Sequence, residues 1–301
     1  MLELKGVTKV FKTGMFGKEE TVAVSNVSFA VEPGEVVSLI GESGSGKTTV
    51  GRMILRLTEP TTGAISFDGT DVATLSRRQL RRYYGHVQGV FQDPFSSYNP
   101  VYKVDRVLGM VRSSYLPGLS TSEWKAKLSD SLEAVSLEPR DVLGKYPHQL
   151  SGGQLQRLMI ARALLLDIKF LVADEIISML DASTRIDVLN LLGDLKARGV
   201  GILFITHDLS LGNYISDKTL ILRRGRIAEY GPTPKVFGNP SHAYTQALLA
   251  SVPQLHRKWT TTADPNAAPV TSAPVGAVVG EDGLFEVDKG HFVAVDEGEL
   301  A

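Results

Sequence analysis

The chain of 301 residues contains no cysteine. This absence excludes disulfide bonds, cysteine-ligated zinc and iron–sulfur clusters, and it is typical of a chain that stays in a reducing compartment. A surplus of charge of one sign is also lacking, because 32 Lys and Arg stand against 33 Asp and Glu and the formal net charge is −1. We therefore expect no nucleic-acid partner, since nucleic-acid-binding domains carry a basic field.

Long apolar runs are missing as well. Stretches such as Val36–Ile40 and Ile202–Ile205 have the length of strands, far below the roughly 18 residues that a membrane helix needs. The first residues, MLELKGVTKVFKTG, contain no apolar core of a secretory signal. We therefore expect neither a signal peptide nor a membrane-spanning segment. With 43% hydrophobic residues the chain can still bury a large core.

Short apolar runs predict the fold. Residues 1–32 alternate in a way that suits antiparallel strands. The continuous run Val36–Ile40 leads into a glycine-rich loop, and Lys47–Leu57 then has helical periodicity. Two more strand-like runs, Phe170–Ala173 and Gly201–Thr206, end in polar residues. This pattern predicts an α/β fold with a parallel sheet whose site lies at the carboxyl ends of its strands.

Helical periodicity recurs at Glu123–Val135, Ser151–Leu166 and Arg185–Ala197. No strand signal appears between Gln92 and Gln149, which predicts a helical subdomain inserted at about residues 93–150 of a domain spanning 1–240. Residues 241–301 would form a C-terminal extension. Within it, the Ala-, Pro- and Thr-rich residues 260–279 read as a linker, and 283–295 as a hairpin.

The stretch GESGSGKTT at residues 41–49 predicts a phosphate-binding loop. Its glycines let backbone N–H groups point at phosphate oxygens, and the following helix presents its positive end to them. The side chain of Lys47 adds a charge, and the hydroxyl of Thr48 stands where Mg²⁺ would sit. The alternative, a glycine-rich surface turn, is disfavoured by the flanking strand and helix. The candidate nucleotide-binding residues of the loop are Gly41, Glu42, Ser43, Gly44, Ser45, Gly46, Lys47, Thr48 and Thr49.

The stretch LSGGQ at residues 150–154 narrows the class of nucleotide-binding protein. Ser151 is a good N-cap, and Gly152 and Gly153 let backbone N–H groups approach an anion closely. With the phosphate loop upstream, the chain resembles the ATP-binding cassette (ABC) ATPases, whose signature sequence is LSGGQ. The resemblance implies a P-loop NTPase core with an antiparallel β subdomain and an inserted helical subdomain.

The resemblance also implies that the signature binds nucleotide across an interface. Ser151, Gly152, Gly153 and Gln154 would contact the γ-phosphate held by the phosphate loop of a partner subunit arranged head to tail. Ser178–Asp181 (SMLD) resembles the D-loop that crosses that interface.

Polar residues follow the two later strands. Asp174 resembles the aspartate that holds Mg²⁺, and Glu175 occupies the position that polarises the attacking water in ABC ATPases. His207, in FITHDLS, resembles the switch histidine that contacts the γ-phosphate. Without the resemblance, the acidic pair would be a solvent-exposed strand end, and His207 a surface or core histidine.

Two further site residues rest mainly on the resemblance. Gln92, in VFQDPFSSYNP, resembles the Q-loop glutamine, which touches Mg²⁺ and the water and links to the membrane partner. The expected catalytic set is thus Glu175, His207 and Gln92, and the expected metal set Thr48, Gln92 and Asp174. Phe11 resembles the aromatic that stacks on adenine, with Phe16 as a rival; either ring could instead belong to the core.

One stretch departs from the family. ABC ATPases usually continue the acidic pair as DEPTSALD, whereas this chain has DEIISMLD, with Ile176 and Ile177 in place of Pro-Thr. The catalytic acids are unchanged, so we expect activity to be retained and the path into the D-loop to differ slightly.

Three stretches resemble the F-type ATPase subunit of oligopeptide and dipeptide importers: residues 46–69, the Q-loop, and residues 231–253. The closing LFEVDKGHFVAV resembles that group's C-terminal extension; some members carry an iron–sulfur cluster there, which a chain without cysteine excludes. The resemblance implies ATP and Mg²⁺ as cofactors and a peripheral place on the cytoplasmic face of the membrane. Its implied partners are a D-type ATPase, two membrane permease subunits and, indirectly, an extracytoplasmic solute-binding protein.

The resemblance implies an ATP-hydrolysing subunit that powers an importer for oligopeptides or related solutes. Peptides are the commonest cargo of this branch, but related importers carry oligosaccharides or nickel, so the sequence leaves the solute open. A soluble ABC ATPase of translation or DNA repair is the main alternative, but these normally have two cassettes or long coiled coils. An exporter cassette is a second alternative, but most are fused to membrane helices.

Overall fold

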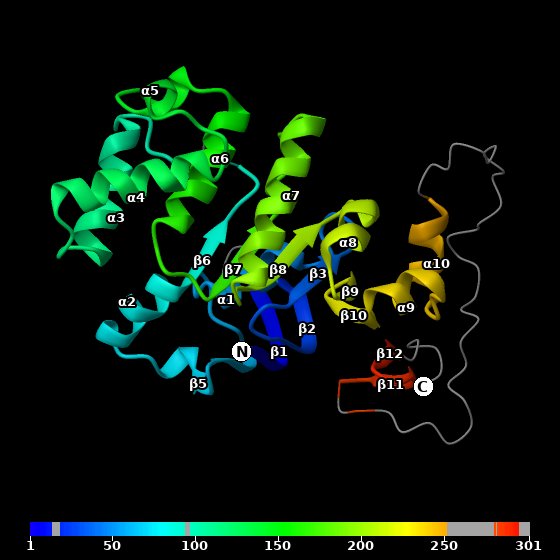
Figure 1. The fold of residues 1–301 in the computed structure, drawn as a ribbon. Helices are drawn as coiled ribbons and strands as arrows, with labels where there is room; N and C mark the ends of the chain where they lie inside the picture. Colours follow the sequence, from blue (N-terminus) through cyan, green and yellow to red (C-terminus); the bar gives the residue numbers. More distant parts are fainter. Residues whose placement is uncertain (14–18, 94–96, 252–279, 281, 295–301) are drawn as a thin grey trace. The chain divides into compact units, whose positions relative to one another are not determined.

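The computed structural model describes residues 1–13, 19–93, 97–251, 280 and 282–294 (Figure 1). The chain divides into two compact units, Met1–Thr74 with Leu203–Ala301 and, between them in sequence, Leu75–Ile202. Strand β8 (Gly201–Thr206) begins in the second unit and ends in the first, and it spans the residues that the sequence predicts.

The first unit opens with an antiparallel sheet in the order β2-β1-β4-β5. Its long pair confirms the antiparallel strands expected for residues 1–32, with Leu2 opposite Val31 at one end. The rival adenine-stacking residue, Phe16, lies outside the described residues. The strands are β1 (Leu2–Thr13), β2 (Glu19–Val31), β4 (Thr62–Phe67) and β5 (Thr70–Asp71).

A second group of strands in this unit surrounds β3. Strand β3 (Val36–Ile40) is buried at every residue and pairs in parallel with β9. The sheet continues antiparallel from β9 to β10, then to β12 and β11. The last two strands confirm the expected C-terminal hairpin, whereas the expected linker at residues 260–279 lies outside the described residues. The strands are β9 (Lys218–Arg223), β10 (Arg226–Pro232), β11 (Leu284–Asp288) and β12 (His291–Ala294).

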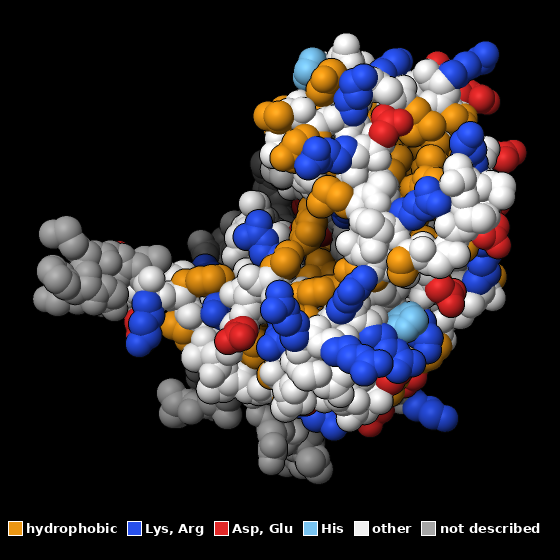
Figure 2. All heavy atoms as spheres, turned by 90° about the vertical axis from the view of Figure 1, so that its left-hand side faces the viewer, with side chains coloured by type: hydrophobic (Ala, Val, Ile, Leu, Met, Phe, Trp, Pro, Cys, Tyr) orange, Lys and Arg blue, Asp and Glu red, His pale blue; other side chains and the backbone are white. Residues whose placement is uncertain are grey.

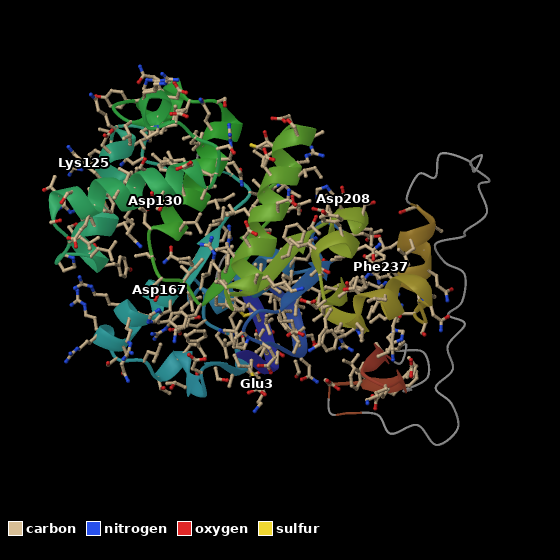
Figure 3. All side chains as sticks on the ribbon, in the orientation of Figure 1. Glu3, Lys125, Asp130, Asp167, Asp208 and Phe237 are labelled. Carbon is tan, nitrogen blue, oxygen red and sulfur yellow. The ribbon has the colours of Figure 1, made fainter. Side chains whose placement is uncertain are left out.

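Helices pack on this group of strands. Their core joins Ile40 of β3 and Ile221 of β9 to Tyr244 of α10, and Phe237 packs against it (Figure 3). Gly212 of α8 lies so close to β3 that a Cβ there would come within 2.6 Å of the Ile40 side chain. The helices are α1 (Lys47–Ile54), α8 (Leu209–Ile215), α9 (Thr233–Gly238) and α10 (Ala243–Ala250), with a 3₁₀ turn η1 (Val72–Thr74).

Helix α1 is shorter than the expected Lys47–Leu57. It ends at Ile54 because Arg56 takes a left-handed φ of 52°. The N–H of Leu57 then donates to the carbonyl of Arg52 at 2.9 Å, and the N–H of Arg56 to that of Met53 at 3.0 Å. This pair of bonds is the Schellman ending, which usually uses glycine and is therefore hard to recognise at an arginine.

The second unit combines two parallel strands with most of the helices. Strands β6 (Val87–Val90) and β7 (Phe170–Asp174) pair in register from Val87 and Phe170 onward. Described residues between Gln92 and Gln149 form helices and no strand, as the sequence predicts. The helices are α2 (Arg77–His86), α3 (Val104–Tyr115), α4 (Thr121–Glu133), α5 (Pro139–Val142), α6 (Gly152–Leu164) and α7 (Ala182–Ala197), with a 3₁₀ turn η2 (Pro147–Gln149).

Capping residues set the helix starts in this unit. Helix α4 begins two residues before the expected Glu123 because Ser120 and Glu123 form a capping box. Helix α7 begins at Ala182, three residues before the expected Arg185, because Asp181 caps it. Figure 2 shows Lys and Arg side chains spread over the face that it draws. In α2 the exposed residues include Arg77, Arg78, Arg81 and Arg82. None of the helices among the described residues combines the length and apolar character that a bilayer crossing requires.

Candidate functional site

The glycine-rich loop after β3 turns in space that only glycine fits. Gly44 and Gly46 take φ of 80° and 106°, a region that other residues avoid. A Cβ on Gly46 would lie 2.4 Å from the carbonyl oxygen of Ala23, and one on Gly41 would lie 2.2 Å from that of Leu222. The backbone of the loop is therefore packed against β2 and β9 and held in one shape.

The loop leads into α1 without a side-chain cap. Gly46 is the N-cap, no acidic residue stands in the first turn, and the first N–H groups of α1 lack intrahelical acceptors. The Oγ of Ser45 is buried with no hydrogen-bond partner among the described residues. Uncapped N–H groups, the helix dipole and this hydroxyl suit a bound anion such as a phosphate group.

Lys47 is held beside the loop although it carries a charge. Its side chain is buried, and its Nζ donates to the carbonyl oxygens of Gly41 at 2.7 Å and Glu42 at 2.8 Å. Thr48 is exposed and Thr49 half-buried, so the hydroxyl of Thr48 can meet an incoming ligand. The residues of the expected phosphate loop thus form one continuous local structure.

His207 follows β8 in the same unit. Its side chain is exposed, and the next residue, Asp208, caps α8 by accepting from the N–H groups of Ser210 at 2.9 Å and Leu211 at 3.3 Å (Figure 3). Since α8 packs on β3 through Gly212, the turn that carries His207 is anchored to the strand that leads into the phosphate loop.

Phe11 lies on β1 opposite Thr21. Its ring is 39% exposed, which argues against a core role, and the Nζ of Lys9 lies 5.1 Å from the ring centroid. An exposed aromatic ring of this kind can stack on a planar ligand.

The acidic pair lies in the second unit. Asp174 ends β7 and is buried, whereas Glu175 is half-buried and takes a left-handed φ of 50°. Ser178 holds this turn, because its N–H and its Oγ both donate to the carbonyl oxygen of Glu175, at 3.1 and 2.9 Å. Ile176 and Ile177, the residues that depart from the family, are both buried and anchor the turn in the core.

The end of the expected D-loop is also built by side-chain hydrogen bonds. Asp181 accepts from the N–H of Thr184 at 3.0 Å and from the Oγ of Ser183 at 2.6 Å. These bonds, the one from the Ser183 hydroxyl above all, hold the pKa of the Asp181 carboxyl well below its usual range. The cap of α7 is therefore charged at neutral pH.

The signature stretch begins α6 with a capping box. The N–H of Gln154 donates to Ser151 Oγ at 3.2 Å, and the N–H of Ser151 donates to Gln154 Oε1 at 2.9 Å. The hydroxyl of Ser151 acts here as an acceptor, so its own proton remains for a bond to an anion. Ser151 is exposed, and Gly152 and Gly153 are half-buried.

Gln92 follows β6 and is exposed. The preceding carbonyl, that of Phe91, accepts from Gln156 Nε2 at 3.2 Å, and Gln156 is a buried residue of α6. The signature helix thus holds the start of the Q-loop directly. Sequence reasoning missed this contact because Gln156 reads as an ordinary polar residue within a helix.

The expected site residues are divided between the two units. Phe11, the phosphate loop and His207 lie in the first unit, and Gln92, the signature, Asp174 and Glu175 lie in the second. One contact of the loop was not anticipated at all: the N–H of Glu42 donates to the Oη of Tyr244 in α10 at 3.2 Å. No local pattern predicts it, since 202 residues separate the two.

Two families match the chain. The family described as ABC transporter matches residues 24–178, and that described as oligopeptide/dipeptide transporter, C-terminal region, matches residues 228–277. A Brucella ovis protein with a peptide import ATP-binding name is 45% identical, over 84% of this chain and 78% of that protein. The oligopeptide transport ATP-binding protein OppF of Streptococcus mutans is 38% identical, over 99% of this chain and 96% of that protein. The dipeptide transport ATP-binding protein DppF of Lactococcus lactis is also 38% identical, over 99% and 95%.

Solved structures are similar as well. A dimeric ATP-binding cassette in a post-hydrolysis state, bound to ADP and phosphate, superposes with a TM-score of 0.70 at 30% identity, covering 77% of this chain and 99% of that one. A dimeric bacterial ABC transporter cassette gives a TM-score of 0.71 at the same identity and coverage.

Proposed function

The chain belongs to the ABC transporter family, and from this membership we propose that it is the ATP-hydrolysing subunit of an importer for oligopeptides or dipeptides. The peptide cargo is supported by the names of the relatives and by the match of the C-terminal region to the oligopeptide/dipeptide transporters. Oligosaccharide import and a soluble, non-transport ATPase have no such support.

The observation that carries the proposal is the phosphate loop. Its left-handed glycines, its uncapped helix start and the buried Oγ of Ser45 suit a chain of phosphate groups. Lys47, already beside the loop, would turn an N–H toward the β- and γ-phosphates. Phe11 would stack on the adenine ring.

The remaining residues would complete hydrolysis. Asp174, Gln92 and the hydroxyl of Thr48 would hold Mg²⁺, which neutralises charge on the phosphate oxygens when bound. Glu175 would orient the attacking water and accept its proton, with His207 beside the γ-phosphate. Mg²⁺ fits this donor set because it prefers one or two carboxylates together with phosphate oxygens.

The same membership supports a proposal for the partners. The signature of each ATPase would close the nucleotide site of the other, so that Ser151 and the N–H groups of Gly152 and Gly153 meet a γ-phosphate bound by the second subunit. That subunit would be a homologous D-type ATPase, and the pair would work beneath two membrane permease subunits that receive peptide from a solute-binding protein. The chain would then act as a peripheral subunit at the cytoplasmic face of the membrane.

Lys47→Ala tests the site. The change removes the charge that meets the phosphates, and a charge-assisted contact of this kind is worth about 1.5–3 kcal/mol, or roughly 10- to 150-fold in affinity. We expect Mg-ATP to bind at least tenfold more weakly in equilibrium dialysis. Exposed Lys12 of β1 gives the control, since Lys12→Ala should bind as wild type. Equal affinity of wild type and Lys47→Ala would refute the assignment of the loop.

A further inference from the structure

A residue of the C-terminal region contacts the phosphate loop. The Oη of Tyr244, in the first turn of α10, accepts a hydrogen bond from the N–H of Glu42 at 3.2 Å. Tyr244 lies within residues 228–277, which match the oligopeptide/dipeptide transporter C-terminal region, whereas the ABC transporter match ends at residue 178. The contact therefore joins a part of the chain outside that ABC match to the loop proposed to bind ATP.

The bond acts on the peptide group that also holds Lys47. The N–H of Glu42 belongs to the same planar peptide unit as the carbonyl of Gly41, and that carbonyl accepts from Lys47 Nζ at 2.7 Å. In a trans peptide the two groups point in opposite directions. Tyr244 on one side and Lys47 on the other thus fix the rotation of one peptide plane at the entrance of the loop.

The side chain of Tyr244 is itself well held. Its ring is buried in the core with Ile40 and Ile221, and the guanidinium of Arg223 lies 5.1 Å from the ring centroid. Burial raises the pKa of the Tyr244 hydroxyl, so that the group stays neutral at physiological pH. A neutral hydroxyl on a fixed ring is a suitable acceptor for a single backbone N–H.

A buried network of hydrogen bonds fixes the start of α10. His242 is its N-cap, and His242 Nδ1 accepts from the N–H of Tyr244 at 3.0 Å. The carboxylate of Glu229 in β10 accepts in turn from the N–H groups of Ser241 at 2.9 Å and His242 at 3.1 Å. Glu229 is fully buried, so these bonds replace its lost hydration.

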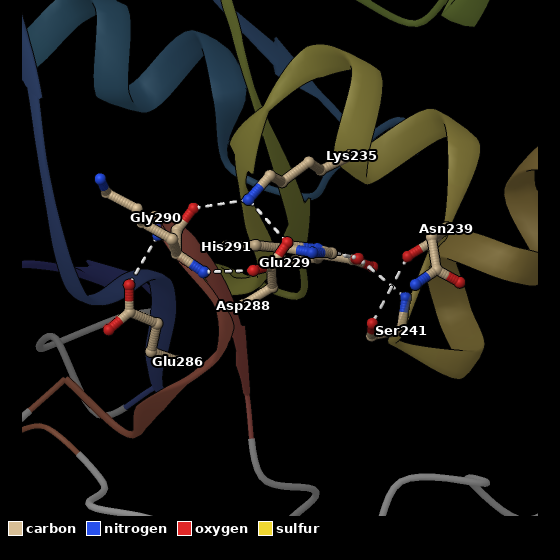
Figure 4. A network of polar contacts seen from close by, with 9 residues as sticks. Glu229, Lys235, Asn239, Ser241, Glu286, Asp288, Gly290 and His291 are labelled. Carbon is tan, nitrogen blue, oxygen red and sulfur yellow. Dashed lines mark hydrogen bonds and ion pairs between the residues drawn. The ribbon is translucent and has the colours of Figure 1, made fainter.

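The C-terminal hairpin contributes a further residue to this network (Figure 4). His291 of β12 lies with its Nε2 2.7 Å from Glu229 Oε1, and both side chains are buried. Lys235 of α9 adds an ion pair to Asp288 at 2.6 Å. A series of contacts thus connects the hairpin to the phosphate loop, and it runs through Glu229, the cap of α10 and Tyr244.

We propose that Tyr244 is a positioning residue of the phosphate loop, and that the C-terminal hairpin keeps it in place through His291 and Glu229. This inference rests on the proposed function, because it takes the loop to be the ATP site. It assigns to the C-terminal region a direct role in nucleotide affinity: with the hairpin docked, the loop holds the shape that receives phosphate.

Tyr244→Phe in the full chain tests the first part. The change keeps the ring, its core contacts and the Arg223 contact and removes only the hydroxyl. A neutral hydrogen bond is worth about 0.5–1.5 kcal/mol, so we expect the dissociation constant for Mg-AMPPNP to rise roughly two- to tenfold. In ATP hydrolysis by this variant, we expect the KM for ATP to rise by the same factor. The kcat at saturating ATP should stay within about twofold of wild type. Tyr214→Phe, in the exposed tyrosine of α8, is the matched control.

The melting temperature of the nucleotide-free chain separates positioning from folding. We expect Tyr244→Phe to melt within about 2 °C of wild type. A fall of more than about 5 °C, or an affinity equal to that of Tyr214→Phe, would overturn the proposal. Lys47→Ala is measured in parallel: if it binds Mg-AMPPNP as wild type does, the proposed ATP site itself is wrong, whereas a defect in Lys47→Ala alone refutes only the role of Tyr244.

Two variants of His291 test the second part. His291→Gln keeps a donor for Glu229, and His291→Leu does not. We expect His291→Leu to weaken Mg-AMPPNP binding at least twofold and His291→Gln to restore most of the loss, both measured well below their melting temperatures. Combined with Tyr244→Phe, His291→Leu should add little, because both act on one path. Wild-type affinity in His291→Leu, or full additivity with Tyr244→Phe, would refute the link to the hairpin.

Discussion

Glu175 has a backbone conformation that its residue type rarely adopts. Its φ of 50° lies in the left-handed region, which costs a non-glycine residue about 1–2 kcal/mol. The two bonds from Ser178 to its carbonyl and the burial of Ile176 and Ile177 keep the turn in this shape. Because the backbone leaves strand geometry at Glu175, the side chains of Asp174 and Glu175 do not alternate as they would along a continued strand.

Glu175→Gln tests the role of Glu175 in hydrolysis. The amide keeps the size of the side chain but is no base, and loss of a catalytic base typically lowers turnover about 10²- to 10⁴-fold. We expect steady-state ATP hydrolysis to fall by that factor while Mg-ATP still binds. The measurement is phosphate release by the chain together with its transporter partners. Turnover within about threefold of wild type would show that another group is the base, and Glu19→Gln, in exposed Glu19 of β2, serves as the control.

Some residues of the site could be predicted from the sequence, and others could not. The glycines of the phosphate loop were predictable, because their spacing with Lys47 and Thr48 reflects the geometry of phosphate binding itself. The left-handed φ of Glu175 was not, since acidic residues give no signal for it. Tyr244 was not either, because its hydrogen bond to Glu42 depends on how α10 packs, and periodicity gives no information on such a pairing.

At the scale of elements, strand β3, strand β8 and the C-terminal hairpin follow from their apolar patterns. The predicted ends of the helices were less accurate, and the causes are local. The N-cap of helix α7, Asp181, lies in the stretch that resembles the D-loop. Helical periodicity alone therefore put the start of this helix too late, at Arg185. Helix α1 stops at an arginine in the left-handed region, where sequence rules expect glycine. Pairing partners far apart in the chain, such as β10 with β12, could not be derived from the sequence of either strand.

The docked hairpin should loosen in acid. Burial alone would raise the pKa of the Glu229 carboxyl, but the hydrogen bonds from His291, Ser241 and His242 outweigh it and hold that pKa below its ordinary value of 4.5. Glu229 therefore stabilises docking fully above pH 4.5, and the contribution is lost as the pH falls through the lower folded-state pKa. We expect the amides of β12 to lose hydrogen-exchange protection, corrected for intrinsic rates, below about pH 4.5 and to show no change from this group between pH 6 and 7.

Two variants check that Glu229 is the group responsible. Glu229→Gln should lower the free energy of unfolding at neutral pH by about 1–3 kcal/mol, because buried donors lose a charged acceptor, and should lack the additional acid loss. Asp288→Asn is the control, because it removes an exposed partner of Lys235 and exposed ion pairs add little to stability. The same acid loss in Glu229→Gln as in wild type would assign the effect to another group.

At the scale of the whole molecule, each ATP site is expected to need the signature of a second ATPase. ATP should favour a closed dimer, and hydrolysis should reopen it. We expect the purified chain to be mainly monomeric and weakly active alone, and to gain activity with the proposed D-type ATPase. Light scattering and ATPase assays of wild type and Glu175→Gln, each with and without that partner and Mg-ATP, measure this. Full activity from a chain that stays monomeric at every ATP concentration would contradict a shared site.

The hairpin also changes which strand the sheet presents to neighbouring molecules. Strand β10 pairs with β12 at Glu229 and Tyr230, so this part of its edge is covered rather than open to another chain. The outermost described strand there is β11, a five-residue strand with exposed Glu286 and Asp288. Short, charged edge strands resist edge-to-edge pairing. A proteolytic cut between α10 and β11 that released the hairpin would expose β10 as a new edge, and the cassette would then become prone to aggregate by sheet extension.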